Sequence, residues 1–190
     1  MTKILLNVEH FIQKIPEDEF NKSEYLKEKG TNEKINLQSC GLTCLRMCIK
    51  YFRNKDIPLA RLMEEAFKSG SFVETGLIHF KFIQLARTYG LEGCLIKEER
   101  IDRFITLVNF MLSSNHLVIA SVKPCLFPLE NTDRKNGHLV LIKGIDEKNF
   151  YLNDPSYLEN RCELNKIVEH ERFFSNFSGN TICVANTDEK

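Results

Sequence analysis

Several features that mark large protein classes are missing from this sequence. Charge of one sign is not in excess, because 26 basic and 26 acidic side chains cancel to a formal net charge of zero. Nucleic acid phosphates are bound by clustered positive charge, so this balance argues against a nucleic acid partner. No run of about 18 apolar residues occurs, so we expect no membrane-spanning helix and no membrane partner.

The sequence also lacks signs of export and of disulfide bonding. The apolar stretch after Met1 is short and is broken by Glu9 and His10, which is unlike a signal peptide. Seven cysteines are an odd number, and their spacing indicates no disulfide framework. We therefore expect a cytoplasmic protein whose thiols are free in a reducing environment.

The chain of 190 residues is long enough for one domain with a hydrophobic core. We expect a single domain over 1–190, with an N-terminal extension (1–35), a helical half (36–115) and a sheet half (116–187). Helical and β-rich patterns predict helices over 40–53, 58–68, 76–89, 101–113 and 164–174 and strands over 94–96, 117–122, 138–145, 150–153 and 180–184. Helices followed by an antiparallel sheet indicate an α+β fold.

Cys40 is the first candidate for a chemically active side chain. A thiol attacks carbonyl groups well only as the thiolate. Cys40 opens the predicted 40–53 helix, where the free N–H groups of the first turn stabilise negative charge. Gly41 follows directly and would let a substrate backbone approach closely.

Two later residues can complete a catalytic set with Cys40. His138 opens a predicted strand, and Asp154 follows the end of the next one, 16 residues later. A hairpin with its turn at 146–149 would fold these two ends back beside each other. His138 would then act as general base and acid, and Asp154 would orient its imidazole. A cysteine, a histidine and an acid in this chain order are typical of papain-type thiol enzymes.

The cysteines also have other interpretations. Cysteine on an apolar helical face is most often a packing residue, which fits Cys44 and Cys48, and Cys40 taken alone is as consistent with packing as with catalysis. Zinc binding is a further use of thiols at this spacing. The first and third of these thiols would lie about 12 Å apart on a helix, too far for one tetrahedral ion. No Cys-x-x-Cys pair occurs, so we expect no metal and no other cofactor.

Three segments resemble a known family. The pattern Cys-Gly-Leu-x-Cys-x-Arg-Met-x-x-Lys-Tyr over 40–51 resembles the nucleophile helix of bacterial peptidases that cut double-glycine leader peptides from bacteriocins. Gly137-His138-Leu139-Val140 and Asn153-Asp154-Pro155 match as well, and Tyr157 also fits. The chain is more similar still to the eukaryotic guanylyl-cyclase-domain-containing family, which shares this fold. The resemblance implies a papain-like fold and a peptide or protein substrate.

The chain departs from that pattern at two positions. The peptidases usually have an acid before the cysteine, where this chain has Ser39, and an oxyanion-hole glutamine six residues before it, where this chain has Lys34. The oxyanion donor would then be Gln38, Asn36, or the Cys40 backbone N–H acting with another group. The resemblance also places the turn with Gly76 near the cleft, so we predict substrate contacts at Gly41, Gly76 and Gly137.

These observations favour a cysteine-dependent hydrolase acting on peptide or isopeptide bonds. Cys40 would be the nucleophile, His138 the base and acid, Asp154 the orienting group and Gln38 the oxyanion donor. The same residues would serve an acyltransferase or a deamidase. Lys34 in place of glutamine motivates a further alternative, a catalytically inactive papain-fold module that binds proteins. Nucleotide cyclisation is disfavoured, because no glycine-rich phosphate loop and no carboxylate pair for two magnesium ions occur.

Overall fold

The computed structural model describes residues 2–73, 76–123, 137–156 and 166–187. Within them, seven strands form one antiparallel sheet in the order β4-β9-β5-β6-β7-β8, and β1 pairs with β6 beside this path. The strands are β1 (Ile4–Leu5), β2 (Phe72–Val73), β3 (Gly76–Leu77), β4 (Leu91–Lys97), β5 (Leu117–Val122), β6 (His138–Ile145), β7 (Asn149–Asn153), β8 (Lys166–Glu169) and β9 (Phe177–Asn186). The helices are α1 (Glu17–Lys22), α2 (Glu24–Lys29), α3 (Asn32–Gln38), α4 (Cys40–Arg53), α5 (Leu59–Lys68), α6 (His79–Thr88), α7 (Ile101–Ser113) and α8 (His170–Asn176).

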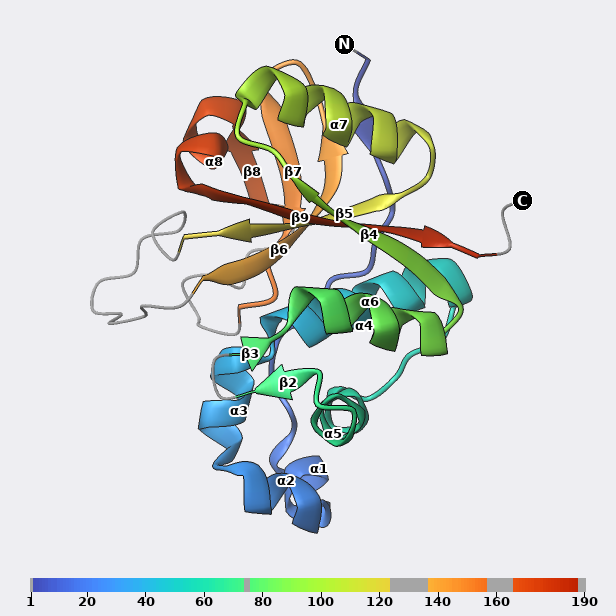
Figure 1. The fold of residues 1–190 in the computed structure, drawn as a ribbon, viewed down its shortest axis with the longest axis vertical. Helices are drawn as coiled ribbons and strands as arrows, with labels where there is room; N and C mark the ends of the chain where they lie inside the picture. Colours follow the sequence, from blue (N-terminus) through green and yellow to red (C-terminus); the bar gives the residue numbers. More distant parts are fainter. Residues whose placement is uncertain (1, 74–75, 124–136, 157–165, 188–190) are drawn as a thin grey trace.

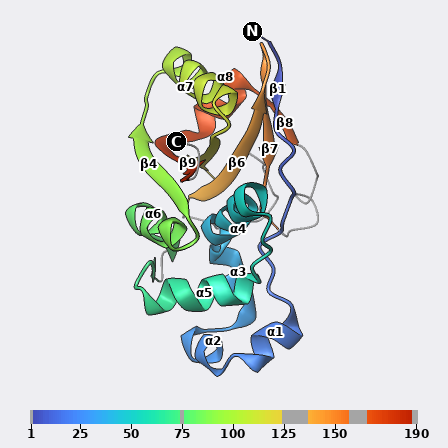
Figure 2. The same ribbon diagram turned by 90° about the vertical axis from the view of Figure 1, so that its right-hand side faces the viewer.

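Helices cover both faces of the sheet. α4 and α6 lie against one face, and α7 and α8 lie against the other (Figures 1 and 2). The central strand β6 is buried along its whole length. Its side chains alternate, since Leu139 and Leu141 join the core under α4 while Val140 and Ile142 join the core under α7. Burial on both faces explains why this strand reads as a continuous apolar run.

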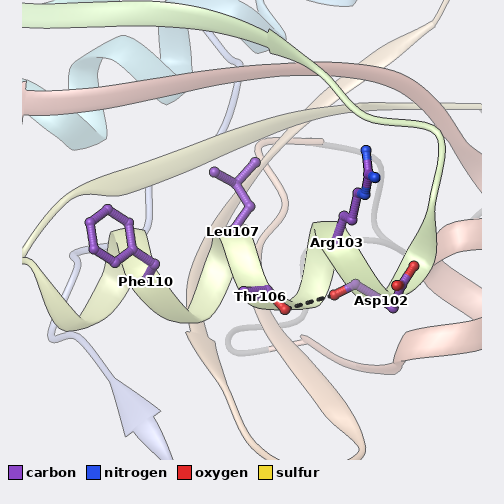
Figure 3. A pocket seen from close by; sticks show the side chains of 5 residues that line it. All are labelled: Asp102, Arg103, Thr106, Leu107 and Phe110. Atoms are coloured by element: carbon purple, nitrogen blue, oxygen red, sulfur yellow. Dashed lines mark hydrogen bonds between the residues drawn. The ribbon is translucent and has the colours of Figure 1, made fainter.

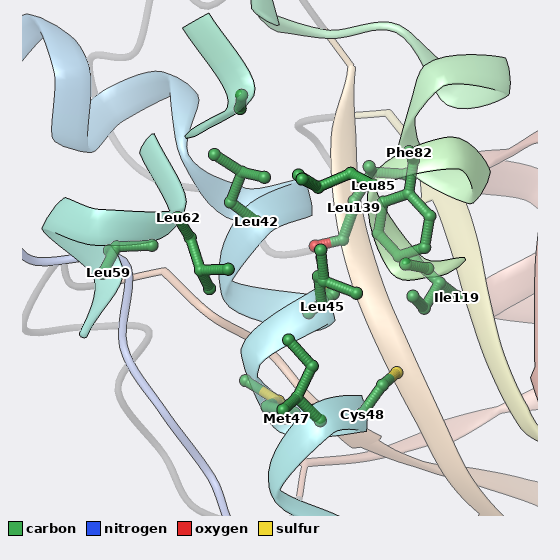
Figure 4. Close-up of a cluster of buried hydrophobic side chains, with 14 of the residues drawn as sticks. Leu42, Leu45, Met47, Cys48, Leu59, Leu62, Phe82, Leu85, Ile119 and Leu139 are labelled. Atoms are coloured by element: carbon green, nitrogen blue, oxygen red, sulfur yellow. The ribbon is translucent and has the colours of Figure 1, made fainter. Parts of the chain in front are cut away.

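The core under α4 fixes that helix on the sheet. Leu45 and Cys48 project from α4 toward β6 and α6, where they meet Leu139 and Phe82 (Figure 4). Full burial of one such leucine stabilises a fold by about 1.5–3 kcal/mol. The packing therefore fixes where the first turn of α4 stands relative to the start of β6.

Aromatic rings hold the opposite layer together. The ring centroid of Phe104 in α7 lies 5.6 Å from that of Phe150 in β7 and 4.4 Å from that of Phe177 in β9. It also stacks on Phe173 of α8 at 5.8 Å. Aromatic pairs at such separations add to the stabilisation that burial supplies. α7 is thereby tied to three other elements of this layer.

The structure confirms the predicted α+β class and corrects two predicted helices. The helix expected over 76–89 begins only at His79, because Gly76, at a φ of 111°, pairs in the β2–β3 hairpin. The helix expected over 164–174 begins at His170, since Lys166–Glu169 form strand β8 against β7. No described helix combines the length and the apolar character needed to span a membrane.

Candidate active site

Cys40 lies in the first turn of α4, as the sequence predicted. α3 ends at Gln38, and the buried Ser39 joins the two helices. The Ser39 hydroxyl donates to the backbone oxygen of Asn36 at 3.0 Å. The backbone oxygen of Ser39 accepts from the backbone N–H of Thr43 at 2.9 Å. This compact junction leaves Cys40 partly buried at the start of a long helix, where the N–H groups of the first turn favour a thiolate.

The β6–β7 hairpin brings His138 and Asp154 together. Its turn closes through the Asp146 N–H, which donates to the Asn149 oxygen at 3.0 Å, and its ladder pairs Asn153 with Leu141. Asp154 follows directly, and its Oδ1 accepts a hydrogen bond from His138 Nε2 at 2.6 Å. Both side chains are buried, so the imidazole is held firmly in one orientation.

Among the influences that lower the pKa of the Cys40 thiol, His138 is the largest. Burial alone would raise the pKa of the thiol, but His138 and the backbone N–H groups of Leu139 and Gly41 outweigh it and lower that pKa. Burial likewise opposes protonation of His138, whereas Asp154 and Cys40 raise its pKa to about 9. The site therefore favours a thiolate beside an imidazolium.

Asp154 has two further partners. Its Oδ2 lies 3.1 Å from Lys166 Nζ, and its Oδ1 accepts from the Ser156 N–H at 3.0 Å. Burial raises the pKa of the carboxyl group, but the hydrogen bond and charge of His138, the charge of Lys166 and the Ser156 N–H together hold that pKa well below its usual range. The carboxylate is thus kept ionised inside the protein.

Sequence reasoning missed Lys166. It opens β8 directly opposite Leu152, and Asp154 lies two residues after Leu152, just past the end of β7. Its side chain is buried, which is uncommon for lysine unless a partner is present. The helix predicted over 164–174 hid this strand pairing, so no sequence signal pointed to the contact.

A segment near the N-terminus, residues 8–15, connects two walls of the site. His10 Nε2 donates to the Asp154 backbone oxygen at 2.6 Å, and the Gln13 N–H donates to the Pro155 oxygen at 2.6 Å. At the other end, Gln13 Nε2 donates to the backbone oxygen of Asn36 at 2.8 Å, and the backbone N–H of Ile15 donates to the side-chain Oδ1 of Asn36 at 2.8 Å. We call residues 8–15 the strap, because they tie the turn with Asp154 to the helix before Cys40.

The oxyanion candidates occupy different positions. Asn36 is buried, and its amide accepts from Ile15 and donates to Asn32. Lys34 lies on the exposed face of α3, and its stem runs beside Gly30. Gln38 is partly buried at the end of α3, where its backbone oxygen approaches Gly76. The Asn36 amide thus helps to hold the strap, whereas Gln38 stands just before Ser39 and Cys40.

The three predicted glycines differ in their surroundings. At Gly41 a Cβ atom would lie 2.8 Å from Leu77 and 2.9 Å from Leu139, so glycine lets these side chains pack close to α4. Gly76 combines its positive φ with a place beside Gln38. A Cβ atom at Gly137 would meet only ordinary contacts. Packing thus accounts for Gly41, and substrate contact at the three glycines stays a prediction.

Two surface hollows in the described part of the chain involve none of these residues. One, of about 410 Å³, lies along α7 and is lined by side chains of that helix from Asp102 to Phe110 (Figure 3). The other, of about 260 Å³, lies beside β4 and β9. Neither contains a residue of the Cys40 site, so neither enlarges it.

The family of the chain follows from a comparison with known proteins. The Peptidase C39-like family matches residues 19–179, which include Cys40, His138 and Asp154. The chain belongs to this family. Family and fold make it a cysteine peptidase-like protein. No curated protein matches it in sequence.

Solved structures of C39 peptidases share the fold. A Bacillus anthracis protein named as a C39-like peptidase matches with a TM-score of 0.63 at 19% identity, over 98% of each chain. The peptidase domain of Streptococcus ComA matches with a TM-score of 0.56 at 18% identity, over 79% of this chain and 93% of that one. A double-glycine-motif protease from an AMS/PCAT transporter, solved with its leader peptide, matches at 0.51 and 21%, over 76% and 81%. The predicted papain-like class is thereby confirmed.

Proposed function

We propose that this C39-like protein is a cysteine peptidase in which Cys40 is the nucleophile. The observation that carries the proposal is the hydrogen bond of 2.6 Å between His138 Nε2 and the Asp154 carboxylate, together with the lowering of the pKa of the Cys40 thiol by His138. The lowered pKa of the thiol and the raised pKa of the imidazole support an ion pair ready for attack.

The chemistry follows from this arrangement. The Cys40 thiolate attacks the carbonyl carbon of the scissile bond, and the negative charge moves to the carbonyl oxygen. His138 donates its proton to the leaving amine as the C–N bond breaks, which leaves a thioester on Cys40. Water then loses a proton to His138 and attacks the thioester, releasing the acid. Asp154 holds the ring throughout and stabilises the imidazolium.

We infer that a peptide with two glycines before the scissile bond is the first substrate class to test. One structure similar to this chain is a double-glycine-motif protease bound to its leader peptide. A matching probe is an acyloxymethyl ketone that carries a Gly-Gly dipeptide. The wild type should be labelled at Cys40, and Cys40→Ala should not be labelled. Cys44→Ala removes the buried thiol one turn later and should still be labelled. Equal labelling of all three proteins would refute the proposal.

Gln38 is our candidate for the oxyanion donor. Its support is its place just before Cys40 and the use of the Asn36 amide in holding the strap. Removing one oxyanion donor typically slows catalysis by about 100-fold or more. We expect Gln38→Ala to slow cleavage of a Gly-Gly peptide amide by this factor with little change in KM. Lys34→Ala, on the exposed side of the same helix, is the control. An unchanged kcat would assign the role to other donors.

Two alternatives use the same fold. An acyltransferase or deamidase would resolve the thioester with an amine or act on a glutamine side chain, which mass spectrometry of the products with and without added amine detects. An inactive binding module, motivated by Lys34, would neither label at Cys40 nor cleave peptides, and Cys40→Ala would leave partner binding unchanged. The closer similarity to the eukaryotic guanylyl-cyclase-domain-containing family, the cytoplasmic location and the domain limits stay predictions.

A further inference from the structure

Two thiols face each other on neighbouring strands outside the candidate active site. Cys94 of β4 and Cys183 of β9 are directly opposite in the antiparallel ladder, and these strands run side by side (Figure 1). Opposite residues of such a ladder have Cα atoms about 4.5–5.5 Å apart. This separation lies inside the range of about 4.4–6.8 Å that disulfides require. The register of the two strands is therefore compatible with a disulfide between these residues.

The two thiols differ in access. Cys94 is exposed, whereas Cys183 is buried with 4% of its surface accessible. Burial first, and then the charge and hydrogen bond of Cys94, raise the pKa of Cys183 to about 12. Both thiols line the hollow of about 260 Å³, together with Met111 and His116. A reagent in solvent therefore meets Cys94 first, with Cys183 in contact behind it.

Metal binding is the other common use of paired thiols. Zinc sites in proteins take three or four ligands from cysteine, histidine or carboxylate side chains. Within the described ranges, no three such side chains are arranged to hold a metal ion. The pair thus offers two sulfurs and no chelate, which leaves thiol oxidation as its chemistry.

We propose that Cys94 and Cys183 form a reversible oxidation site, which a low-molecular-weight disulfide such as oxidised glutathione converts into a cross-strand disulfide. The Cys94 thiolate attacks one sulfur of the oxidant, whose S–S bond breaks and releases one glutathione thiolate. Cys183 loses its proton to solvent, attacks the Cys94 sulfur and releases the second. The two protein thiols lose two electrons, and one oxidised glutathione becomes two molecules of glutathione.

The bond would join the outermost strand of the sheet to its neighbour. β4 ends the strand order and pairs only with β9 among the described strands. A disulfide that closes so long a loop restricts the unfolded chain, so oxidation should raise the Tm by several degrees. This site does not depend on Cys40, and its test needs no peptidase activity.

The test starts with the reduced full chain and oxidised glutathione. After free thiols are blocked with iodoacetamide, the unreduced protein is digested and its peptides are analysed by mass spectrometry. We expect a cross-linked Cys94–Cys183 peptide pair and a Tm several degrees higher, both reversed by dithiothreitol. Cys183→Ser should stop at the mixed disulfide of Cys94 with glutathione. Cys94→Ser should give neither the cross-link nor the rise in Tm.

A matched control removes two other thiols. Cys125 and Cys162 lie outside the described residues, and a variant with both changed to serine should still form the cross-link. If buried Cys183→Ser fails to fold, exposed Cys94→Ser still tests the pairing. The proposal is overturned if Cys94 in the wild type stops at the glutathione adduct, or if the rise in Tm persists in Cys94→Ser.

Discussion

Three cysteines lie on successive turns of α4, and the pKa of the first is lowered while the pKa values of the other two are raised. The pKa of Cys40 is lowered, because His138 and two backbone N–H groups outweigh its burial. The pKa of Cys44 is raised well above its usual value, mainly by burial, and its thiol donates to the Leu139 oxygen at 3.7 Å. Burial also raises the pKa of Cys48. The comparison teaches that the influence of one imidazole, at the start of the helix, separates a thiol of lowered pKa from two buried thiols of raised pKa.

The largest change in this contrast should come from His138→Gln. Iodoacetamide reacts with thiolates, so wild-type Cys40 should react well below pH 7, where a thiol with a pKa of about 8.5 reacts slowly. Without the imidazole, we expect its alkylation rate at pH 6 to fall by about 100-fold or more. Cys44 and Cys48 should remain unreactive in both proteins. Mass spectrometry of tryptic peptides across a pH series measures each rate separately.

The stability of the wild type and of His138→Gln should also depend differently on pH above neutrality. The folded-state pKa of His138 is raised to about 9, so the stabilisation that its protonation supplies is complete below about 6.5 and is lost as the pH rises through about 9. The wild type should therefore lose more stability than His138→Gln over this interval. If the Tm values of the two proteins fall equally between pH 6.5 and pH 9, the proposed ion pair between Cys40 and His138 is refuted.

A smaller effect is expected from Lys166→Met. This change leaves the buried Asp154 carboxylate with fewer partners, and breaking a buried pair costs about 3–5 kcal/mol of the free energy of unfolding. The pKa of Asp154 is held below its usual value, so this contribution is present above pH ~4 and is lost as the pH falls. The difference in Tm between the wild type and the variant should shrink below about pH 4.

The alkylation rate of Cys40 distinguishes a role of Lys166 in positioning Asp154 and His138 from a role in stability alone. A less firmly ionised Asp154 holds the imidazolium less well, so in Lys166→Met we expect Cys40 alkylation at pH 6 to fall by about tenfold. Lys143→Met is the matched control, because Lys143 is another buried lysine of the sheet, on β6. It should lower the Tm without changing the alkylation rate. An equal loss of rate in both variants would remove the special role of Lys166.

The sequence could predict the elements that have their own clear pattern. α4, β5 and β6 have the predicted bounds, because each combines a marked apolar period or run with definite ends. α1 and α2 have six residues and one buried side chain each, too little for a period to emerge. The hairpin turn at 146–149 was predictable because its Asp and Asn residues close it locally.

The site was predictable only where a motif marked it. Cys40, His138 and Asp154 lie in recognisable segments, and the hairpin gave a reason for two of them to meet. His10 and Asp154 are 144 residues apart in the chain, and no local pattern encodes such a contact. Lys166 is comparable, because its burial depends on a carboxylate from another strand. Motifs thus indicated the proposed reacting groups, whereas the residues that contact them emerged only from tertiary pairing.

The smallest effect on the cysteine contrast should come from the strap. In Asn36→Ala the buried N–H of Ile15 loses its acceptor, which typically costs about 1–3 kcal/mol. Cys40, His138 and Asp154 are themselves unchanged, so we expect Cys40 alkylation at pH 6 to change only a few-fold. Lys34→Ala, two residues earlier on the exposed face of α3, should change neither property.

Hydrogen exchange locates the effect of Asn36→Ala. The N–H groups of Gln13 and Ile15, which donate to Pro155 and Asn36, should exchange faster, while the amides of β6 stay protected. Faster exchange at these two positions together with a small change in Cys40 reactivity would show that the strap supports the turn with Asp154 without tuning the thiol. A collapse of the Cys40 reactivity to that of Cys44 would instead make the strap part of what sets the contrast.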